Sequence, residues 1–182
     1  YGGLTSSPQR FFIKVQVKYS YIDNIALYVT DSTDSKRFDV VYDGKNATLT
    51  NFTTDLSYFI AEKLRVGFKA ELNDYNTSTQ IKAWNRPTTR LTGNFNYSIA
   101  KKFIFNANVF YIGARKARFN TAKQDFVTLK AATDMNLDIE YRYSKTLSVF
   151  TRFDNIRGLG YDRWLYYPSY GFNFIAGITF AL

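Results

Sequence analysis

Two residue types that carry much of catalytic and metal-binding chemistry are absent from this sequence, which contains no cysteine and no histidine. Without cysteine there can be no disulfide, no thiolate nucleophile and no cysteine-containing zinc site. Without histidine the commonest general base and metal ligand is missing too. Carboxylate pairs or a serine–lysine arrangement remain chemically possible. We therefore expect a protein that is not an enzyme and that holds no cofactor.

Long apolar segments are absent as well. The chain has no run of about 18 apolar residues, so we expect no transmembrane helix. It opens with Tyr1-Gly2-Gly3 and lacks the basic start and the apolar segment of a signal peptide. We expect a mature chain or a fragment.

The charge is unbalanced but dispersed. Lysine and arginine total 24 against 15 aspartate and glutamate residues, which gives a formal net charge of +9 at pH 7. The basic residues occupy alternating positions rather than one continuous run, and this pattern is not typical of a nucleic-acid-binding surface. We therefore expect no nucleic-acid partner.

Aromatic residues are abundant, at 19% of the chain with 15 Tyr and 17 Phe. Apolar residues recur with a period near two, which indicates strands. Many of these segments are roughly 10 to 15 residues long, whereas soluble strands usually have about five or six and a membrane-crossing strand needs about nine to eleven. The segments are 11–21, 48–60, 64–72, 91–99, 103–111, 129–143, 147–153 and 172–182, with less regular runs at 25–28 and 38–42.

The predicted connections alternate in length. Short turns fall near residues 22–24, 61–63, 100–102 and 144–145, and longer connections near 31–45, 73–88, 113–126 and 157–169. Transmembrane barrels combine tight periplasmic turns with longer extracellular loops. The sequence therefore predicts an all-β fold, an antiparallel transmembrane β-barrel with about nine strands, in which residues 1–182 form a single domain.

A soluble β-sandwich or a lipocalin-like barrel would also alternate apolar and polar residues. Aromatic residues at the predicted strand ends favour the membrane, because aromatic girdles lie at membrane interfaces. These residues, all expected beside short turns, are Tyr19, Tyr21, Tyr97, Phe103, Tyr141 and Tyr143.

The end of the chain, Gly177-Ile178-Thr179-Phe180-Ala181-Leu182, resembles the C-terminal signal by which outer-membrane barrels are recognised for insertion. Leu182 stands where this signal usually has Phe, and Ile175 stands where a polar residue is common. The resemblance assigns Gly177, Phe180 and Leu182 to the signal. It implies contact with the barrel-assembly machinery during biogenesis.

Upstream, Phe153-Asp154-Asn155-Ile156 followed by Tyr161 resembles the penultimate strand of TonB-dependent receptors, and similar segments extend the resemblance over about residues 37–182. It implies a bacterial outer-membrane location, solute uptake, and the lipid bilayer and TonB as partners. Such receptors have 22 strands and an N-terminal plug domain, for which this sequence offers no candidate. We therefore expect the C-terminal part of a larger barrel.

Charged residues on the polar side of the predicted strands would line a lumen and set the field felt by solutes. The alternative, which we favour, is that they pair across strands and brace the wall. The acidic members share one face but are interleaved with basic ones, so we expect no metal site. The lumen-facing candidates are Arg10, Lys14, Lys18, Arg65, Lys69, Glu71, Lys130, Asp134, Asp138, Glu140 and Arg142.

Four aromatic residues, Trp84, Trp164, Tyr166 and Tyr167, fall in or beside the longer connections. They could stack on a sugar or another flat ligand. They could equally anchor the protein at the outer interface, and we favour this interpretation because it is the commoner role of Trp and Tyr in barrels.

Two functions stay open. The first, implied by the resemblance, is solute uptake through a TonB-dependent-receptor-like or porin-like barrel. The second is a structural barrel subunit of a larger envelope complex, in assembly or secretion, without transport of its own. An outer-membrane lipase or protease would need unusual machinery in a chain without histidine.

Overall fold

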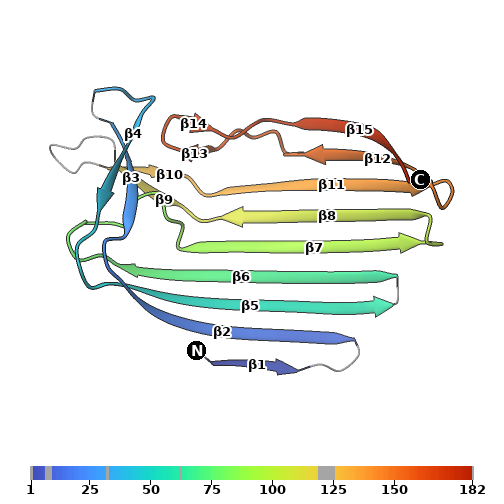
Figure 1. Cartoon of the computed structure of the whole chain (residues 1–182), viewed down its shortest axis with the longest axis horizontal. Helices are drawn as coiled ribbons and strands as arrows, with labels where there is room; N and C mark the ends of the chain where they lie inside the picture. Colours follow the sequence, from blue (N-terminus) through green and yellow to red (C-terminus); the bar gives the residue numbers. More distant parts are fainter. Residues whose placement is uncertain (1, 7–9, 32, 62, 119–125, 182) are drawn as a thin grey trace.

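The computed structural model describes residues 2–6, 10–31, 33–61, 63–118 and 126–181. These residues form strands β1 to β15, and no helix among them is suited to crossing a membrane. One antiparallel sheet has the order β1-β2-β5-β6-β7-β8-β11-β12-β15 (Figure 1). Its strands are β1 (Gly2–Ser6), β2 (Phe11–Ile22), β5 (Ala47–Ala61), β6 (Leu64–Asn76), β7 (Thr89–Ile99), β8 (Phe103–Ile112), β11 (Ala132–Arg142), β12 (Leu147–Asp154) and β15 (Asn173–Phe180).

Three small hairpins lie in the connections at one end of this sheet, called the hairpin end below (Figure 1). They pair β3 (Ala26–Thr30) with β4 (Phe38–Tyr42), β9 (Arg115–Arg118) with β10 (Phe126–Leu129), and β13 (Asp162–Trp164) with β14 (Tyr167–Pro168). The opposite end, called the turn end, carries the tight connections between β5 and β6, β7 and β8, and β11 and β12. Three of the four predicted short turns, near 61–63, 100–102 and 144–145, are thereby confirmed.

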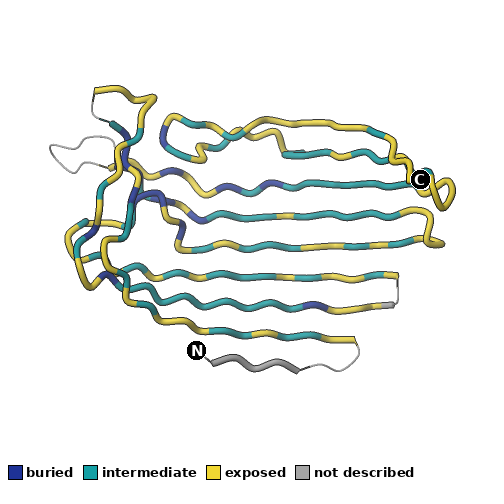
Figure 2. Tube along the Cα trace, viewed as in Figure 1, coloured by how far each residue is buried: buried dark blue, intermediate teal, exposed yellow. Residues whose placement is uncertain are grey.

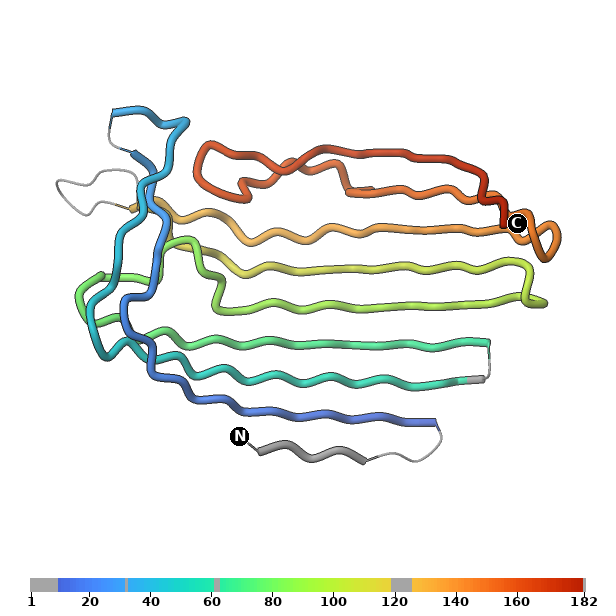
Figure 3. Tube along the Cα trace, in the orientation of Figure 1, coloured from blue at the N-terminus to red at the C-terminus, as the bar shows by residue number. Residues whose placement is uncertain are grey.

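The strands follow one another across the sheet in chain order, so the trace passes steadily from one edge to the other (Figure 3). Hairpin connections between sequential antiparallel strands produce this arrangement. The fold class predicted from the period of the apolar residues is therefore confirmed as all-β and antiparallel.

The prediction of a short turn at 22–24, followed by a wall strand at 25–28, is wrong. β2 and β5 pair up to Ile22 and Ala47, and the same two chain segments pair again as β3 and β4. Asn24 and Asn46 interrupt the ladder, with φ of 53° and 69°, a left-handed conformation that asparagine tolerates better than most residues. β3 and β4 are thus the outer part of one long bent hairpin.

The strand predicted at 129–143 begins later than expected, at Ala132. Leu129 ends β10 instead, and its side chain is buried with Ala117 and Leu165. Lys130 therefore lies in the connection between β10 and β11, outside the main sheet. The alternation of apolar residues continues through this break, which is why the sequence pattern did not reveal it.

The turn between β7 and β8 has an unusual sequence for its shape. Ala100 and Lys101 both have positive φ, 49° and 58°, and the N–H of Lys102 donates to the carbonyl of Ile99 at 2.9 Å. This is the two-residue turn that suits the twist of a hairpin, and Asn-Gly is its preferred sequence. The prediction of a tight turn at 100–102 is confirmed.

The two faces of the sheet differ in composition. One face collects the apolar positions of neighbouring strands in register, as in the aligned series Ile13, Leu56, Phe68. Many of these side chains are exposed, among them Val17 at 49% and Ile178 at 70%. A soluble sandwich would bury this apolar face against a second sheet. Among the described residues nothing packs over it.

Buried hydrophobic residues gather at the hairpin end instead (Figure 2). One cluster contains Leu27, Val29 and Trp84, with Ile25 and Val41 packed against it. The second is the Ala117, Leu129 and Leu165 group. Within the described part of the chain, hydrophobic cores therefore belong to the connections and not to the large sheet.

The aligned rows of the sheet run obliquely to its two ends. One row starts at Phe11, beside the turn end of β2, and reaches Phe174, close to the hairpin end of β15. β15 reaches the turn end at Phe180, six residues after Phe174. The row has therefore shifted along the strands by six residues, about 20 Å, while it crosses seven strand-to-strand spacings, about 34 Å. This shift corresponds to a strand tilt of roughly 30°. Such a stagger is close to that of transmembrane barrels.

Aromatic residues of the apolar face lie near both ends of the sheet. Tyr97, Phe103 and Tyr141 lie near the turn end, as predicted. Tyr19 and Tyr21 lie at the opposite, hairpin end, because β2 runs on to Ile22 without a turn. Between Phe11 and Tyr21 the strand is about 34 Å long, which at the tilt of roughly 30° spans about 29 Å, enough to cover the apolar band of about 25 Å of a transmembrane barrel.

Candidate functional site

The face opposite the apolar one carries most of the charged residues that the sequence singled out. Lys14 and Lys69 are both aligned with Asp55, their common neighbour on β5. Arg10 lies one position before β2 and Lys130 lies between β10 and β11, so neither is part of this face. The strands place the other candidates on one side, here called the polar face: Lys14, Lys18, Arg65, Lys69, Glu71, Asp134, Asp138, Glu140 and Arg142.

Most described ion pairs of this face join two residues of the same strand rather than residues of neighbouring strands. Lys69 Nζ lies 2.6 Å from Glu71 Oε1, and Arg142 Nε lies 2.9 Å from Glu140 Oε1, each pair on a single strand. Arg152 Nε and Asp138 Oδ1, 2.6 Å apart, join β12 to β11. From the sequence we favour charged residues that pair across neighbouring strands. Among the described ion pairs, only Arg152–Asp138 does so. Pairs this exposed contribute little stability.

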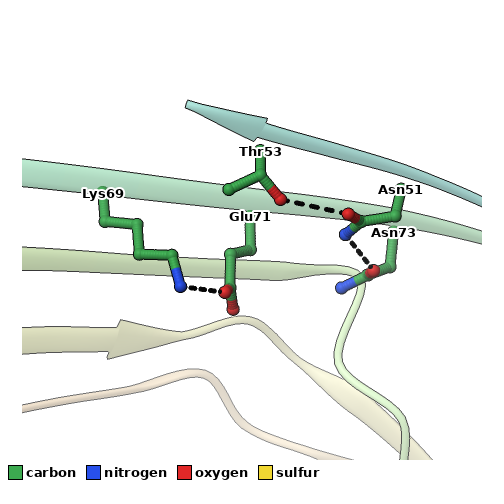
Figure 4. Close-up of polar contacts among 5 residues, drawn as sticks. All are labelled: Asn51, Thr53, Lys69, Glu71 and Asn73. Carbon is green, nitrogen blue, oxygen red and sulfur yellow. Dashed lines mark hydrogen bonds and ion pairs between the residues drawn. The ribbon is translucent and has the colours of Figure 1, made fainter. Parts of the chain in front are cut away.

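Neutral amides brace the strands as well, and sequence reasoning did not anticipate them. Asn51 Nδ2 donates to Asn73 Oδ1 at 2.8 Å, and Thr53 Oγ1 donates to Asn51 Oδ1 at 3.0 Å, next to the Lys69–Glu71 pair (Figure 4). Two further amide pairs join β7 to β8 at 2.8 Å: Asn96 with Asn106 and Asn94 with Asn108. The sequence signal that could have predicted these amide pairs is the presence of asparagines at matching positions of consecutive strands. They give the polar face a lining of hydrogen-bonding groups.

Asp134 has a different role from the other charged candidates, because its side chain is only 1% exposed. Its Oδ1 accepts the N–H of Met135 at 2.8 Å and the N–H of Arg157 at 3.1 Å. Arg157 also donates from Nη1 to the carbonyl of Thr133 at 3.0 Å. Asp134 therefore holds the connection after β12 against β11, and it is not a solvated charge on the polar face.

A buried carboxylate ties the first long connection to the second. Asp43 is fully buried, and its oxygens accept the N–H groups of Ser78, Thr79 and Gln80 at 2.7 to 2.8 Å. Burial is the largest single influence and would raise the pKa of Asp43, but the N–H donors of Ser78, Gln80 and Thr79 together hold it well below its usual value. The carboxylate stays ionised and orders the chain after β6.

The loop aromatics form a contact between distant hairpins. Trp164 of β13 meets Tyr28 and Phe38 of the β3–β4 hairpin at ring-centroid distances of 5.7 and 5.6 Å. Tyr167 lies 4.8 Å from Phe38, and its hydroxyl donates to the carbonyl of Lys36. Strands that are far apart in the sheet order thus send their connections to one place.

The favoured role of interface anchor does not fit Trp84. Its side chain is 1% exposed and lies in the hydrophobic cluster with Leu27 and Val29, while its indole N–H donates to Gln80 Oε1 at 3.0 Å. Burial also excludes stacking on a ligand. Tyr166, by contrast, is 58% exposed at the tip between β13 and β14.

A cavity of about 530 Å³ lies between the polar face and the β13–β14 hairpin. Asn136, Asp154 and Asn173 line it from the sheet, and Tyr161, Trp164 and Tyr170 are among the residues that line it from the connection. Its size is within the range of about 300–1,000 Å³ that is usual for small-molecule sites. Among the described residues no group of three acidic side chains is placed to hold a metal ion.

The residues of the predicted insertion signal are only partly described. Phe180 lies on the apolar face and is 64% exposed, and Leu182 lies outside the described residues. Gly177 is aligned with Phe150 of β12, and an ideal Cβ on this glycine would lie 2.6 Å from Phe150 Cζ. The ring therefore covers the glycine, an arrangement known to stabilise glycines in sheets.

We expect Gly177→Val to destabilise the protein by about 1–3 kcal/mol, because the new side chain displaces the Phe150 ring. Denaturant unfolding in phospholipid vesicles measures this change. Ala176→Val, on the opposite face, is the matched control and should have little effect. The double variant Gly177→Val/Phe150→Ala should lose less than the sum of its single changes, and strict additivity would contradict the packing role.

No protein-family model and no curated protein matches the sequence. Solved structures do match. The copper transporter OprC aligns over 99% of this chain and 31% of its own, with a TM-score of 0.79 and 14% identity. The siderophore receptor PirA from Acinetobacter baumannii aligns over 99% of this chain and 31% of its own, with a TM-score of 0.74 and 11% identity.

The pyoverdine outer membrane receptor FpvA from Pseudomonas aeruginosa PAO1 aligns over 95% of this chain and 27% of its own, with a TM-score of 0.72 and 13% identity. The chain thus spans less than a third of the length of these structures. They are named as transporters or receptors, and none as an enzyme. At this identity the likeness concerns architecture, and the chain has the fold of part of the barrel wall of TonB-dependent receptors, as the sequence resemblance implied.

Proposed function

We propose that this chain is part of the wall of a bacterial outer-membrane β-barrel that takes up a solute. The observation that carries the proposal is the exposed apolar face, which continues across the aligned strands with a polar face behind it. A lipid-facing wall with a polar lumen has this composition. The named functions of the structures with the same fold support uptake.

The sheet needs further strands to close into a barrel. Because its nine paired strands are antiparallel, the edge strands β1 and β15 run in the same direction and cannot pair with each other antiparallel. Closed walls leave no unpaired backbone edge in the membrane. We infer that additional strands complete the ring around the polar face, which then lines a lumen.

The partners follow from this assignment. The apolar face contacts the lipid bilayer, and the barrel-assembly machinery inserts the chain, with Gly177, Phe180 and Leu182 as its recognition signal. TonB supplies the energy for uptake. Lys14, Lys18, Arg65 and Lys69 give the lumen wall a positive stretch on β2 and β6.

Single-cysteine variants test the proposal, since the chain has no cysteine of its own. In intact cells that make the full-length protein, a small water-soluble maleimide should label Lys69→Cys on the polar face. Phe68→Cys, its neighbour on the apolar face, is the matched control and should stay unlabelled. Labelling of Lys69→Cys should fall in cells that lack TonB.

The alternative function, a structural subunit without transport, predicts a different outcome. An interior without a path for solutes would leave Lys69→Cys unlabelled whether or not TonB is present. This alternative has less support, because the structures that share the fold are named for transport or reception.

A further inference from the structure

A second cavity, of about 420 Å³, lies where four connections meet above the polar face of β7 and β8. Four arginines line it: Arg86 from the connection after β6, Arg90 from β7, Arg115 from β9 and Arg163 from β13. No carboxylate lines it. The sheet residues that line it, Arg90, Phe110 and Ile112, belong to the polar face, so the cavity lies on the side of the sheet away from the apolar face.

Among the described residues, none of the four arginines of this cavity forms an ion pair with a carboxylate. Arg115 donates to the backbone carbonyls of Arg163 and Asp162 at 3.0 and 2.8 Å, and Arg86 donates to that of Ala26 at 3.4 Å. Carbonyls orient a guanidinium but carry no net charge to balance it. The site therefore has several like charges around one space.

Two residues that line this cavity also carry a buried polar atom without a partner among the described residues: Arg115, at Nε, and Asn85, at Oδ1. Arg115 is 5% exposed and Asn85 is 8% exposed. The amide of Asn85 is oriented by its Nδ2, which donates to the carbonyl of Tyr28 at 2.9 Å. A buried polar atom without a partner costs free energy. A ligand here would supply an acceptor to Arg115 and a donor to Asn85.

Aromatic side chains complete the walls of the cavity, among them Tyr28, Phe110 and Trp164. Tyr28 and Trp164 are held edge to face, with ring centroids 5.7 Å apart. Rigid aromatic walls favour a flat ligand.

We propose that this cavity, which we call the arginine cavity, binds the solute as a flat aromatic acid with at least two negative charges and a hydroxyl group. The arginines take the carboxylates, the Asn85 carbonyl accepts the hydroxyl proton, and the aromatic residues flank the ring. This inference rests on the proposed uptake function and names the chemical class of its solute.

Calorimetric binding to the purified full-length protein tests the proposal with three probes. We expect 5-hydroxyisophthalate to bind, isophthalate to bind more weakly because it lacks the hydroxyl, and the uncharged 5-hydroxyisophthalamide not to bind. Affinity for the dianion should fall as sodium chloride is raised. Equal binding of the dianion and the diamide would overturn the proposal, as would no binding of any probe.

Variants locate the binding site. Arg90→Gln and Arg163→Gln should each weaken 5-hydroxyisophthalate binding by about tenfold. Arg65→Gln removes the same charge from the polar face near the turn end and is the matched control, with unchanged affinity. Thermal unfolding should show that all three variants fold. Loss of binding in Arg65→Gln as well would indicate a diffuse charge effect and overturn the site assignment.

The two proposals fail differently. If the labelling of Lys69→Cys depends on TonB but the aromatic acids do not bind, uptake stands and the solute class is wrong. If the acids bind but Lys69→Cys stays unlabelled in all cells, the cavity stands and the uptake function is wrong.

Discussion

Ala107→Arg should destabilise the protein by about 2–4 kcal/mol, because it places a charge at the middle of the apolar face, which we propose faces lipid. Ala107 lies on the apolar face of β8, aligned with Phe95 on one side and Leu137 on the other. An arginine there finds neither water nor a carboxylate among its aligned neighbours. Denaturant unfolding of the full-length protein in phospholipid vesicles measures the loss.

The matched control is Asn106→Arg, one residue away on the polar face. Asn106 is aligned with Asp138 of β11, which already pairs with Arg152, and the new guanidinium remains solvated on the polar face. We expect a change below about 1 kcal/mol, which reflects the lost Asn96–Asn106 hydrogen bond. If both variants lost the same stability, the apolar face would not be the lipid-facing one.

Asp43→Asn should release the connection after β6 from the β3–β4 hairpin, at a cost of about 2–3 kcal/mol at neutral pH. The three N–H donors of residues 78–80 converge on the buried carboxylate, and an amide satisfies them less well. Hydrogen exchange of the amides of Ser78, Thr79 and Gln80 provides a local measurement. These amides should exchange faster in the variant, and those of β7 should not.

The same contact gives the connection a defined acid sensitivity. The folded-state pKa of Asp43 lies below the unfolded value, about 3.9, so its contribution is fully present above that value and is lost as pH falls towards the lowered folded-state pKa. Protection of residues 78–80 should therefore fall below about pH 4 in the natural chain. In Asp43→Asn it should not vary with pH over this range, and an unchanged acid dependence would contradict the assignment.

The strands of the wall were predictable because each side chain has one of only two environments. Phe68 lies on the apolar face and Lys69 on the polar face, and this period-two signal depends on no distant contact. The same property explains the errors. Ala26–Thr30 and Leu129 continue the alternation in small hairpins, so a pattern that records only alternation cannot separate a wall strand from a loop strand.

The site was less predictable, because its contacts join residues far apart in the chain. Nothing near Trp84 in the sequence indicates that Leu27 and Val29 bury it, and nothing near Asp43 indicates that it holds residues 78–80. The arginine cavity likewise collects Arg86, Arg115 and Arg163 from three separate connections. The candidates from the sequence were charged residues on the polar side of predicted strands, so the arginines of the connections were not among them.

The position of the buried hydrophobic clusters implies that heat and cold act differently on the two parts of the molecule. The Leu27–Val29–Trp84 cluster excludes water, so its stabilisation weakens on cooling. In the barrel proposed above, backbone hydrogen bonds hold the large sheet without competition from water. On cooling, the hairpins should therefore loosen while the large sheet stays intact, so that a cold-treated protein would keep its long strands but lose the packing of the hairpin end.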